Sequence, residues 1–224
     1  HQFRCYTSLG WEIPAEGAVL LGGNAQGKTS LLEAICFALT LNTPRTSRTD
    51  RLVQHGASTF GISLGTDTGT RRILWQDKKI SLAVDGVPIK DSRTYLEESP
   101  PAVWLGNADI ALVSGGAEER RRFLDFLGAQ WHPAYRAALR DYRKALKLRN
   151  LLLRNPRHNT ATLRSYAEVL ARSGGVLMEL RAQLLELIRP HIAHYHAGIS
   201  ARAEDIGVAY RPSTTLPLAA ALEE

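Results

Sequence analysis

The alternation of apolar and polar residues predicts strands at the start of the chain and a helix directly after them. Residues Phe3–Ile13 have the composition of a strand, and the apolar run Ala18–Leu21 predicts a short buried strand. From Ser30 to Leu39 the apolar residues recur every three or four positions, which predicts a helix. The expected apolar face of this helix consists of Leu31, Leu32, Ile35 and Leu39.

Between residues 60 and 89 the pattern changes to short alternating runs. Phe60–Leu64, Arg71–Trp75 and Ile80–Val84 predict three strands. The dipeptide Asp85-Gly86 is a strong hairpin signal, because both positions of such a tight turn favour a positive φ, so a fourth strand is expected at Val87–Ile89. The sequence therefore predicts an antiparallel sheet beside the first helix.

From about Glu118 the period becomes helical over two long stretches. The first carries Leu124, Leu127, Trp131, Tyr135, Ala138, Tyr142, Ala145, Arg149 and Leu152 at spacings of three and four. After a polar break at residues 155–159, the second carries Leu163, Tyr166, Leu170, Leu177, Leu184, Ile188 and His191, and we expect an interruption near Gly174-Gly175. Two such stretches predict an antiparallel helical hairpin.

These patterns predict an α/β protein with two domains and a short further region. We expect an ATP-binding lobe over residues 1–105, a helical arm over 106–200, and the start of a returning strand region over 201–224. Within that last region, Asp205–Pro212 has the character of a strand. The chain opens on His1 and its last region is short, so we expect it to be a fragment of a longer protein.

The loop before the first helix matches the P-loop spacing G-x-x-x-x-G-K-[ST]. Glycines let the backbone point its N–H groups at phosphate oxygens, and the N-terminus of the following helix attracts anions. In such a loop Lys28 reaches the β- and γ-phosphates, and Thr29 offers a hydroxyl to Mg²⁺. The candidate nucleotide-binding residues are Gly22, Gly23, Asn24, Ala25, Gln26, Gly27, Lys28, Thr29 and Ser30. This favours nucleoside triphosphate binding over an ordinary glycine-rich turn.

Composition narrows the class of protein without identifying a partner. The chain has 224 residues, 44% of them hydrophobic, and no apolar run approaches the ~20 residues of a membrane-spanning helix. Its two cysteines, Cys5 and Cys36, form no C-x-x-C motif, which favours a reducing cytoplasm over a disulfide framework or a zinc site. The net charge of +6 favours a polyanionic partner.

A basic helical face is the candidate surface for such a partner. It consists of Arg140, Arg143, Lys144 and Lys147. This face either follows a phosphate backbone or is simply solvated, and the residues alone do not decide between the two. A second candidate surface lies on the sheet, around Arg71, Arg72, Lys78 and Lys79.

Several separated blocks of sequence resemble the RecF family, the DNA replication and repair ATPases of the SMC-like ABC class. The blocks are Asn24–Ile35, Arg45–Val53, Arg121–Asp125 and Tyr142–Asn150. They follow the order of the family and, with Phe3-Arg4, cover nearly the whole chain. Ala25 departs from the family, which usually has glycine there; alanine fits this position if its φ is negative.

The resemblance implies an ATP- and Mg²⁺-binding P-loop head of the ABC/SMC type, with a helical arm inserted into it. It also implies an ATP-dependent homodimer that binds double-stranded and gapped DNA, and works with the RecR and RecO mediators to support RecA loading. By position, Lys28 and Thr29 are the triphosphate and Mg²⁺ residues, and Asn24 and Arg4 are candidate contacts to the nucleotide. The loop with Arg45, Arg48 and Arg51 either approaches the nucleotide or is a solvated basic loop.

Two segments imitate the motifs that ATP hydrolysis requires in this class. Ile80–Asp85 resembles a Walker B strand, but Gly86 favours the hairpin. Val113–Glu118 resembles the ABC signature, but it lies where RecF relatives have a glycine-containing turn. We therefore expect both motifs beyond residue 224 and leave the catalytic residues unassigned. The resemblance implies that the full-length protein is a weak DNA-dependent ATPase.

Three other functions stay open or are set aside. A non-hydrolysing, ATP-gated DNA clamp is an alternative to the ATPase. A small-molecule kinase shares the P-loop but needs a lid and an acceptor pocket that no segment supplies. A metal site at His191, His194 and His196 is disfavoured, because only the first two share a helical face and no carboxylate is spaced to join them.

Overall fold

The computed structural model describes residues 1–46, 48–154, 159–200, 205–212 and 214. They belong to two compact units, His1–Gly106 and Asn107–Glu224, each of which is described by itself.

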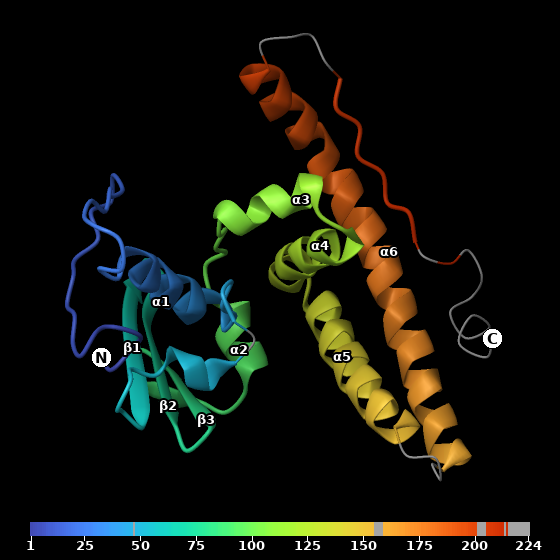
Figure 1. The fold of residues 1–224 in the computed structure, drawn as a ribbon, viewed down its shortest axis with the longest axis horizontal. Helices are drawn as coiled ribbons and strands as arrows, with labels where there is room; N and C mark the ends of the chain where they lie inside the picture. Colours follow the sequence, from blue (N-terminus) through green and yellow to red (C-terminus); the bar gives the residue numbers. More distant parts are fainter. Residues whose placement is uncertain (47, 155–158, 201–204, 213, 215–224) are drawn as a thin grey trace. The chain divides into compact units, whose positions relative to one another are not determined.

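The first unit is built on a four-stranded antiparallel sheet (Figure 1). Its strands are β1 (Thr59–Thr66), β2 (Gly69–Gln76), β3 (Lys79–Val84) and β4 (Val87–Ile89), paired in sequence order. The four predicted strands are thereby confirmed. The predicted hairpin at Asp85-Gly86 is confirmed too, because Val84 pairs with Val87 and both turn residues have positive φ, 48° and 80°.

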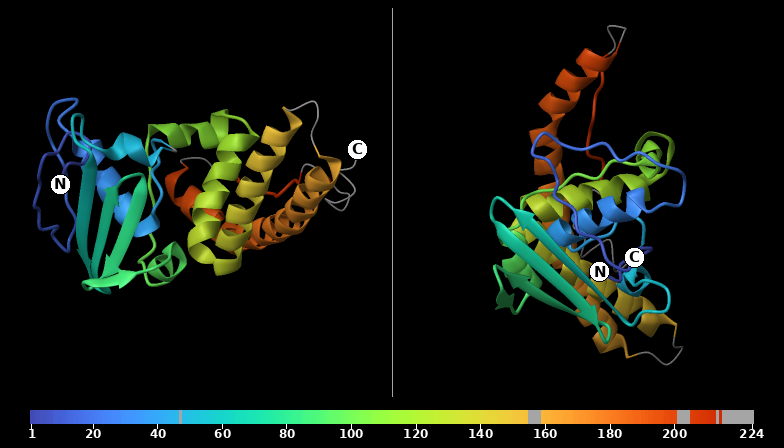
Figure 2. Two further views of the ribbon diagram at one scale, coloured as in Figure 1. Left: turned by 90° about the horizontal axis from the view of Figure 1, so that it is seen from below. Right: turned by 90° about the vertical axis from the view of Figure 1, so that its left-hand side faces the viewer.

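Register brings the alternating apolar residues of the sheet onto one face. Phe60 of β1 pairs with Trp75 of β2, and Ile73 of β2 pairs with Leu82 of β3. Because side chains alternate along each strand, these positions point to the same side, where helix α1 (Lys28–Thr40) packs on the sheet (Figure 2). The core on this side consists of Phe3, Phe37, Ala38, Leu52, Phe60, Ile73, Leu82, Val84 and Tyr95.

Helix α2 (Ser92–Glu97) closes this core. Its N-terminus is capped by Asp91, whose carboxylate accepts hydrogen bonds from the N–H groups of Arg93 and Thr94. Tyr95 is fully buried, and its hydroxyl donates to the carbonyl oxygen of Ala38 in α1 at 2.7 Å. This bond ties the two helices together over the sheet.

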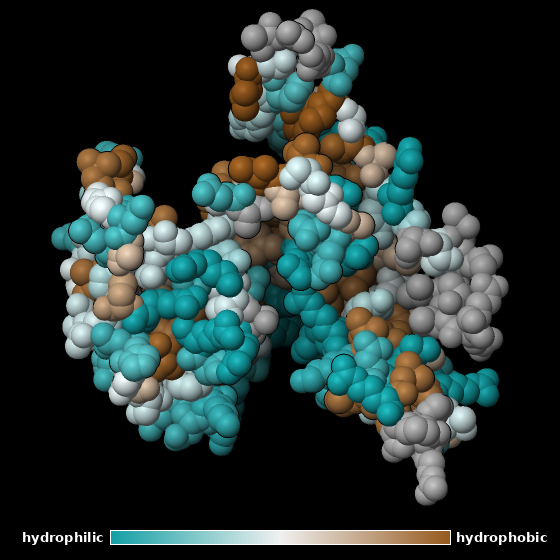
Figure 3. All heavy atoms as spheres, viewed as in Figure 1, coloured by the Kyte–Doolittle hydropathy of each residue, from teal (hydrophilic) through white to brown (hydrophobic). Residues whose placement is uncertain are grey.

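The first unit departs from the sequence-based prediction at its start. The predicted strands at Phe3–Ile13 and Ala18–Leu21 are wrong: Phe3 makes only isolated bridges to Tyr6 and Val53, and residues 8–23 contain no strand. A strand needs a hydrogen-bonded neighbour, and the described strands β1–β4 pair only with one another. Apolar side chains consequently lie at the surface before α1 (Figure 3), with Val19 and Leu21 84% and 88% exposed.

The predicted first helix is confirmed as α1, but it buries a different face. Its buried residues are Glu33, Cys36, Phe37 and Ala38, whereas Leu32 is 47% exposed. The helix carries apolar residues on most of its circumference, so the pattern alone could not tell which side would meet the sheet.

The second unit is helical. After the 3₁₀ helix η2 (Asn107–Ile110) come α3 (Ala111–Ser114), α4 (Ala117–Trp131), α5 (Pro133–Leu153) and α6 (Thr160–Ile199). Proline at the first position of α5 and the ring of His132, which accepts from the N–H of Ala134, define the start of that helix. The carboxamide of Asn159 caps α6 in the same manner.

Helices α5 and α6 form the predicted antiparallel hairpin (Figure 1). The predicted stripes are buried only in part: Tyr135, Ala138 and Leu177 lie at the centre of the contact with Leu139 and Leu180, whereas Trp131 and His191 are exposed. The first predicted stretch is also divided at His132 into α4 and α5. The expected interruption at Gly174-Gly175 is wrong, because α6 continues through both glycines and Gly174 is buried in the helix contact. Residues 155–158 of the predicted break lie outside the described residues, and the predicted strand at Asp205–Pro212 is absent from this described segment.

Candidate nucleotide-binding site

The P-loop lies at the N-terminus of α1, as its sequence predicts. Gly27 is the residue that caps the helix, with φ 95°, and no side chain caps the first turn. The first turn also carries no acidic residue. The uncapped N–H groups and the helix dipole therefore provide a partial positive charge that suits an anion.

Lys28 lies folded over the loop that precedes it. Its Nζ donates hydrogen bonds to the carbonyl oxygens of Gly22 at 2.7 Å and Gly23 at 2.6 Å. The ammonium group is thus held above the glycine-rich backbone, the place from which a P-loop lysine reaches phosphate oxygens. Thr29, the candidate Mg²⁺ ligand, follows it on the exposed first turn of α1.

The backbone of the loop shows why its residue types are restricted. A Cβ at Gly27 would lie 2.7 Å from Cys5 Sγ and from Tyr6 Oη, so the N-terminal segment packs directly against this glycine. Ala25 has φ 63°, which does not meet the condition of a negative φ under which alanine fits without strain. An L-residue in this conformation costs about 1–2 kcal/mol, so Ala25 strains the loop where a glycine would not.

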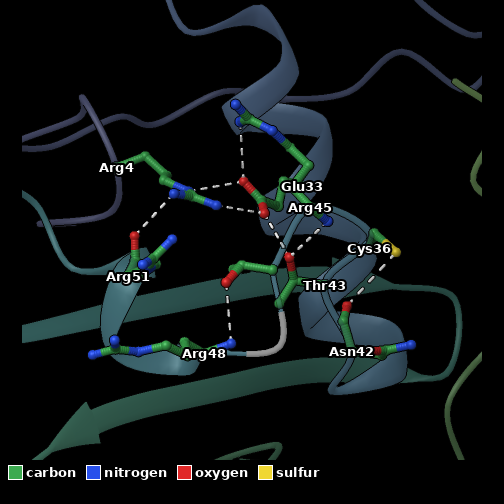
Figure 4. Close-up of polar contacts among 9 residues, drawn as sticks. Arg4, Glu33, Cys36, Asn42, Thr43, Arg45, Arg48 and Arg51 are labelled. Atoms are coloured by element: carbon green, nitrogen blue, oxygen red, sulfur yellow. Dashed lines mark hydrogen bonds and ion pairs between the residues drawn. The ribbon is translucent and has the colours of Figure 1, made fainter. Parts of the chain in front are cut away.

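A buried carboxylate organises the region behind the loop (Figure 4). Glu33, in the second turn of α1, is fully buried and accepts four hydrogen bonds. Arg4 donates two of them, from Nε to Oε2 at 2.9 Å and from Nη2 to Oε1 at 2.8 Å. Thr43 Oγ1 donates at 2.6 Å and Arg45 Nη1 at 3.3 Å. One α1 side chain thereby fixes both the N-terminal segment and the loop after the helix.

These contacts define the surroundings of Arg4, a candidate nucleotide contact, and of the loop with Arg45, Arg48 and Arg51, which the sequence left open between a nucleotide contact and a solvated basic loop. Arg4 also donates to the carbonyl oxygen of Arg51, and Arg48 forms an exposed ion pair with Asp50. The structure therefore brings Arg4 and Arg45 together on Glu33, and places Arg48 apart from them. Nothing in the sequence pattern singled out Glu33; the available signal was an acidic residue on the same helical side as Phe37 and Thr40.

Asp85, which imitates a Walker B residue, belongs to the β3–β4 turn. Its Oδ1 accepts a hydrogen bond from the N–H of Thr70 at 2.7 Å, which fastens the hairpin to β2. The segment Val113–Glu118 forms the turn between α3 and α4: Ser114 ends α3, and Gly115 and Gly116 lead into α4. A Cβ at Gly115 would lie 2.5 Å from the carbonyl oxygen of Ala111, so only glycine fits this position without a shift of the backbone.

The predicted basic face lies on the exposed side of α5. Arg140, Arg143, Lys144 and Lys147 are all exposed, opposite the buried stripe of the helix. Arg140 pairs with Asp141, and Arg143 Nη2 lies 3.3 Å from Asp125 Oδ2. Within the described part of the chain, no ion pair involves Lys144 or Lys147.

One residue of the second candidate surface, Arg71 on the sheet, does not lie at the surface. Arg71 is fully buried and donates to the carbonyl oxygens of Tyr95 and Glu98, with its guanidinium carbon 5.3 Å from the centre of the Tyr95 ring. Because side chains alternate along β2, Arg71 points to the core face of the sheet. Arg72, Lys78 and Lys79 are exposed. Arg71 therefore anchors α2 to the sheet and cannot contact DNA.

A second buried carboxylate, Asp125 in the resemblance block Arg121–Asp125, joins three helices of the second unit. Its Oδ1 accepts hydrogen bonds from Tyr135 Oη in α5 at 2.6 Å and from Arg181 Nη2 in α6 at 2.7 Å. Burial and the hydrogen bond to Asp125 raise the pKa of Tyr135. Asp125 thus fixes α4, α5 and α6 to one another.

Two further results concern metals and membranes. Among the described residues, no group of His, Cys, Asp and Glu is arranged to hold a metal ion, and His191 and His194 are exposed on α6. No helix within the described ranges combines the length and apolar character needed to cross a bilayer.

Comparison with known proteins gives one consistent result. A family model described as an AAA domain matches residues 1–102. A DNA replication and repair protein RecF from Synechococcus sp. (strain JA-2-3B'a(2-13)) is 34% identical over 96% of this chain and 59% of its own length. RecF from Anaeromyxobacter sp. (strain Fw109-5) is 38% identical over 87% of this chain and 53% of its own length. Over nearly its whole length, the chain is therefore similar to RecF proteins.

Solved RecF structures are also similar to the chain and confirm the α/β fold class. The recombination mediator protein RecF-ATPrS in the RecFOR pathway matches with a TM-score of 0.68 and 25% identity, over 80% of this chain and 50% of its own. The RecF-ATP structure of the same pathway matches the fold with a TM-score of 0.72, over 100% of this chain and 65% of its own. The chain thus spans 59% of the length of the Synechococcus RecF relative.

Proposed function

We propose that this chain is the ATP-binding head of a RecF-type DNA repair and recombination protein. The observation that carries the proposal is the P-loop at the uncapped N-terminus of α1, with the Lys28 ammonium held over Gly22 and Gly23. The RecF-ATP and RecF-ATPrS structures, whose names state nucleotide complexes, support it.

In this proposal the residues have separate roles. The backbone N–H groups of residues 22–28 and the α1 dipole bind the phosphates, and Lys28 neutralises the β- and γ-phosphates. The Thr29 hydroxyl binds Mg²⁺, which when present screens the charge of the triphosphate. Asn24 contacts the nucleotide from the loop. Asp85 is given no catalytic role, because its carboxylate is bound to the hairpin backbone.

We further propose that the full-length protein forms an ATP-dependent homodimer in the cytoplasm, binds double-stranded and gapped DNA, and works with RecR- and RecO-type mediators to support RecA loading. The names of the relatives, which refer to DNA replication and repair and to the RecFOR pathway, support this part. A measurement of ATP hydrolysis distinguishes an ATPase from a non-hydrolysing, ATP-gated clamp. An ATPase responds to gapped DNA by releasing phosphate, and the clamp does not.

The test of nucleotide binding is the substitution Lys28→Ala in the full-length protein. Wild type at an ATP concentration ~100 times its dissociation constant, with Mg²⁺, should gain about 2.7 kcal/mol of stability, measured as a rise in melting temperature. Lys28→Ala should lose this gain, while the exposed-lysine control Lys90→Ala should keep it. An equal ATP-dependent rise in Lys28→Ala, or no rise in wild type, would contradict the proposal.

The test of DNA binding uses Lys144→Glu/Lys147→Glu, because these two side chains share the exposed face of α5 and take no part in the Asp125 contacts. Duplex affinity, measured across a salt series with ATP, should fall for every DNA sequence. The slope of log affinity against log salt should flatten by about 2, since each phosphate contact contributes ~0.9.

The matched control is Lys78→Glu/Lys79→Glu, which changes the net charge by the same amount at the β2–β3 turn and the first residue of β3. If the control weakens binding and the α5 variant does not, the DNA surface lies on the sheet unit, and the basic face of α5 is a solvated surface.

A further inference from the structure

Glu33 is a charged side chain whose burial the packing of α1 does not by itself explain. It is 0% exposed, and its two oxygens accept from Arg4, Thr43 and Arg45. Burying a carboxylate among partners rarely stabilises a protein more than an apolar residue of the same volume would. A role in placing its partners accounts for the charge at this position.

The first of those partners, Arg4, has an unusual backbone. Its φ is 53°, and that of Gln2 is 51°, in the left-handed region that non-glycine residues rarely adopt. Such a strained conformation persists only where several surrounding contacts hold it in place. Here the contacts are the two hydrogen bonds to Glu33, one from Arg4 Nη1 to the Arg51 carbonyl, and one from the Arg4 N–H to the Leu52 carbonyl.

The strained turn at Arg4 determines where the next two residues lie. Cys5 Sγ and Tyr6 Oη both fall 2.7 Å from the position of a Cβ on Gly27, which means that they line the backbone of the last loop residue before Lys28. A continuous series of contacts therefore runs from Glu33 through Arg4 to Cys5 and Tyr6, and ends at the P-loop.

We propose that Glu33 is a positioning residue of the nucleotide site, which holds the N-terminal segment against Gly27 through Arg4 and so fixes the shape of the P-loop. The inference rests on the proposed function, because it concerns the affinity of that same site for a nucleoside triphosphate. The hydrogen bonds of the Glu33 carboxylate join it to Arg4, Thr43 and Arg45, so its effect on the loop passes through Arg4.

The substitution Glu33→Gln distinguishes this positioning role from an alternative in which Arg4 binds phosphate directly, because the two predict different changes in Mg·ATP affinity. The amide keeps the size of the side chain but removes the charge and turns one acceptor into a donor facing other donors. If Glu33 positions the segment, the P-loop loosens and Mg·ATP binds about tenfold more weakly, as small misplacements of a binding group do. If Arg4 binds phosphate directly, freeing it from Glu33 leaves affinity unchanged or raises it.

The experiment measures the dissociation constant of Mg·ATP by calorimetry, and the melting temperature, for full-length wild type, Glu33→Gln and Arg4→Lys. Lysine at position 4 keeps the charge but loses the two-pronged contact, so it should weaken binding in the same direction. Asp125→Asn is the matched control: it disrupts a buried, arginine-paired carboxylate in the other unit, and should lower the melting temperature without changing ATP affinity.

The outcomes distinguish failure of the positioning role of Glu33 from failure of the proposed nucleotide binding. Weaker binding in both Glu33→Gln and Arg4→Lys, with unchanged binding in Asp125→Asn, supports the positioning role. A lower melting temperature with unchanged or tighter ATP binding in Glu33→Gln shows that Glu33 is only a structural ion pair and overturns the inference. If Glu33→Gln does not fold, unchanged binding in Arg4→Lys has the same consequence. Absence of ATP binding in wild type overturns the proposed function itself.

Discussion

Substitution of Asp125 by alanine should destabilise the helical unit more than any other single loss of a polar contact there. In the native structure the carboxylate accepts from Tyr135 Oη and Arg181 Nη2, and lies 3.3 Å from Arg143 Nη2. Alanine removes both acceptor oxygens, and with them all three hydrogen bonds, at once. The result is a buried cation, Arg181, without its carboxylate, while Tyr135 Oη keeps only the hydrogen bond that it accepts from Arg181 Nε at 3.1 Å.

The size of the stability loss depends on which of the two arginines can be hydrated once the carboxylate is gone. Arg181 has a side chain only 13% exposed, so it cannot regain full hydration, whereas Arg143 is 62% exposed and can. Removing one partner of a buried ion pair costs about 3–5 kcal/mol, and most of this cost belongs to Arg181. The loss at Arg143 adds little, since exposed pairs contribute about 0–1 kcal/mol.

Hydrogen exchange measured by mass spectrometry resolves this loss by segment. Peptides from α4, α5 and α6 should exchange faster in Asp125→Ala, by a factor that corresponds to about 3–5 kcal/mol, while peptides from β1–β4 keep their wild-type rates. The double variant Asp125→Leu/Arg181→Met replaces the pair by apolar side chains and should recover most of the protection.

Two results would refute this reasoning. Unchanged protection of α6 in Asp125→Ala would show that the helices are held by the apolar stripe alone. A double variant as unstable as Asp125→Ala would show that the loss comes from packing at position 125 rather than from the unpaired cation.

The remaining predictions concern the two cores. Burial raises the pKa of Tyr95 from 10.0 to about 12; the protonated phenol is therefore favoured in the folded state, and its contribution is complete below pH 10 and lost as the pH rises towards 12. Stability of the first unit against urea should fall over this range in wild type and fall less in Tyr95→Phe; equal slopes would contradict this. Gly128→Ala should cost about 1–3 kcal/mol by thermal unfolding, because its Cβ would lie 2.5 Å from the buried Tyr135 ring. The matched change Gly175→Ala, on an open surface of α6, should instead stabilise by up to about 1 kcal/mol, and a loss there would show that helix propensity is not the controlling factor.

Local signals in the sequence predicted most of the fold correctly. The strands β1–β4 alternate with a period of two, and the Asp85-Gly86 turn has the residues that its positive φ values favour. The α5–α6 stripes repeat over many turns, so a helical hairpin was predictable even though its continuity through Gly174 was not. Glycine weakens a helix by only about 1 kcal/mol, which a buried contact can offset.

The errors concern segments whose state depends on distant residues. Ala18–Leu21 is apolar enough for a buried strand, but no described strand pairs with it, and pairing is not encoded in the segment itself. The same limitation applies to Glu33 and Asp125. Their partners lie up to 56 positions away in the sequence, as in the bond between Asp125 and Arg181, and no periodic pattern identifies such pairs.

The position of Lys28 has a thermodynamic consequence for any ligand of the loop. Its ammonium already has two carbonyl acceptors, so a phosphate that takes up this lysine exchanges existing hydrogen bonds for new ones. The enthalpy of binding will then contain only the difference between phosphate and carbonyl as acceptors, and the glycine carbonyls that are released must be rehydrated. Discrimination between a triphosphate and a single phosphate group will accordingly depend on the additional charge of the longer chain more than on this one cation.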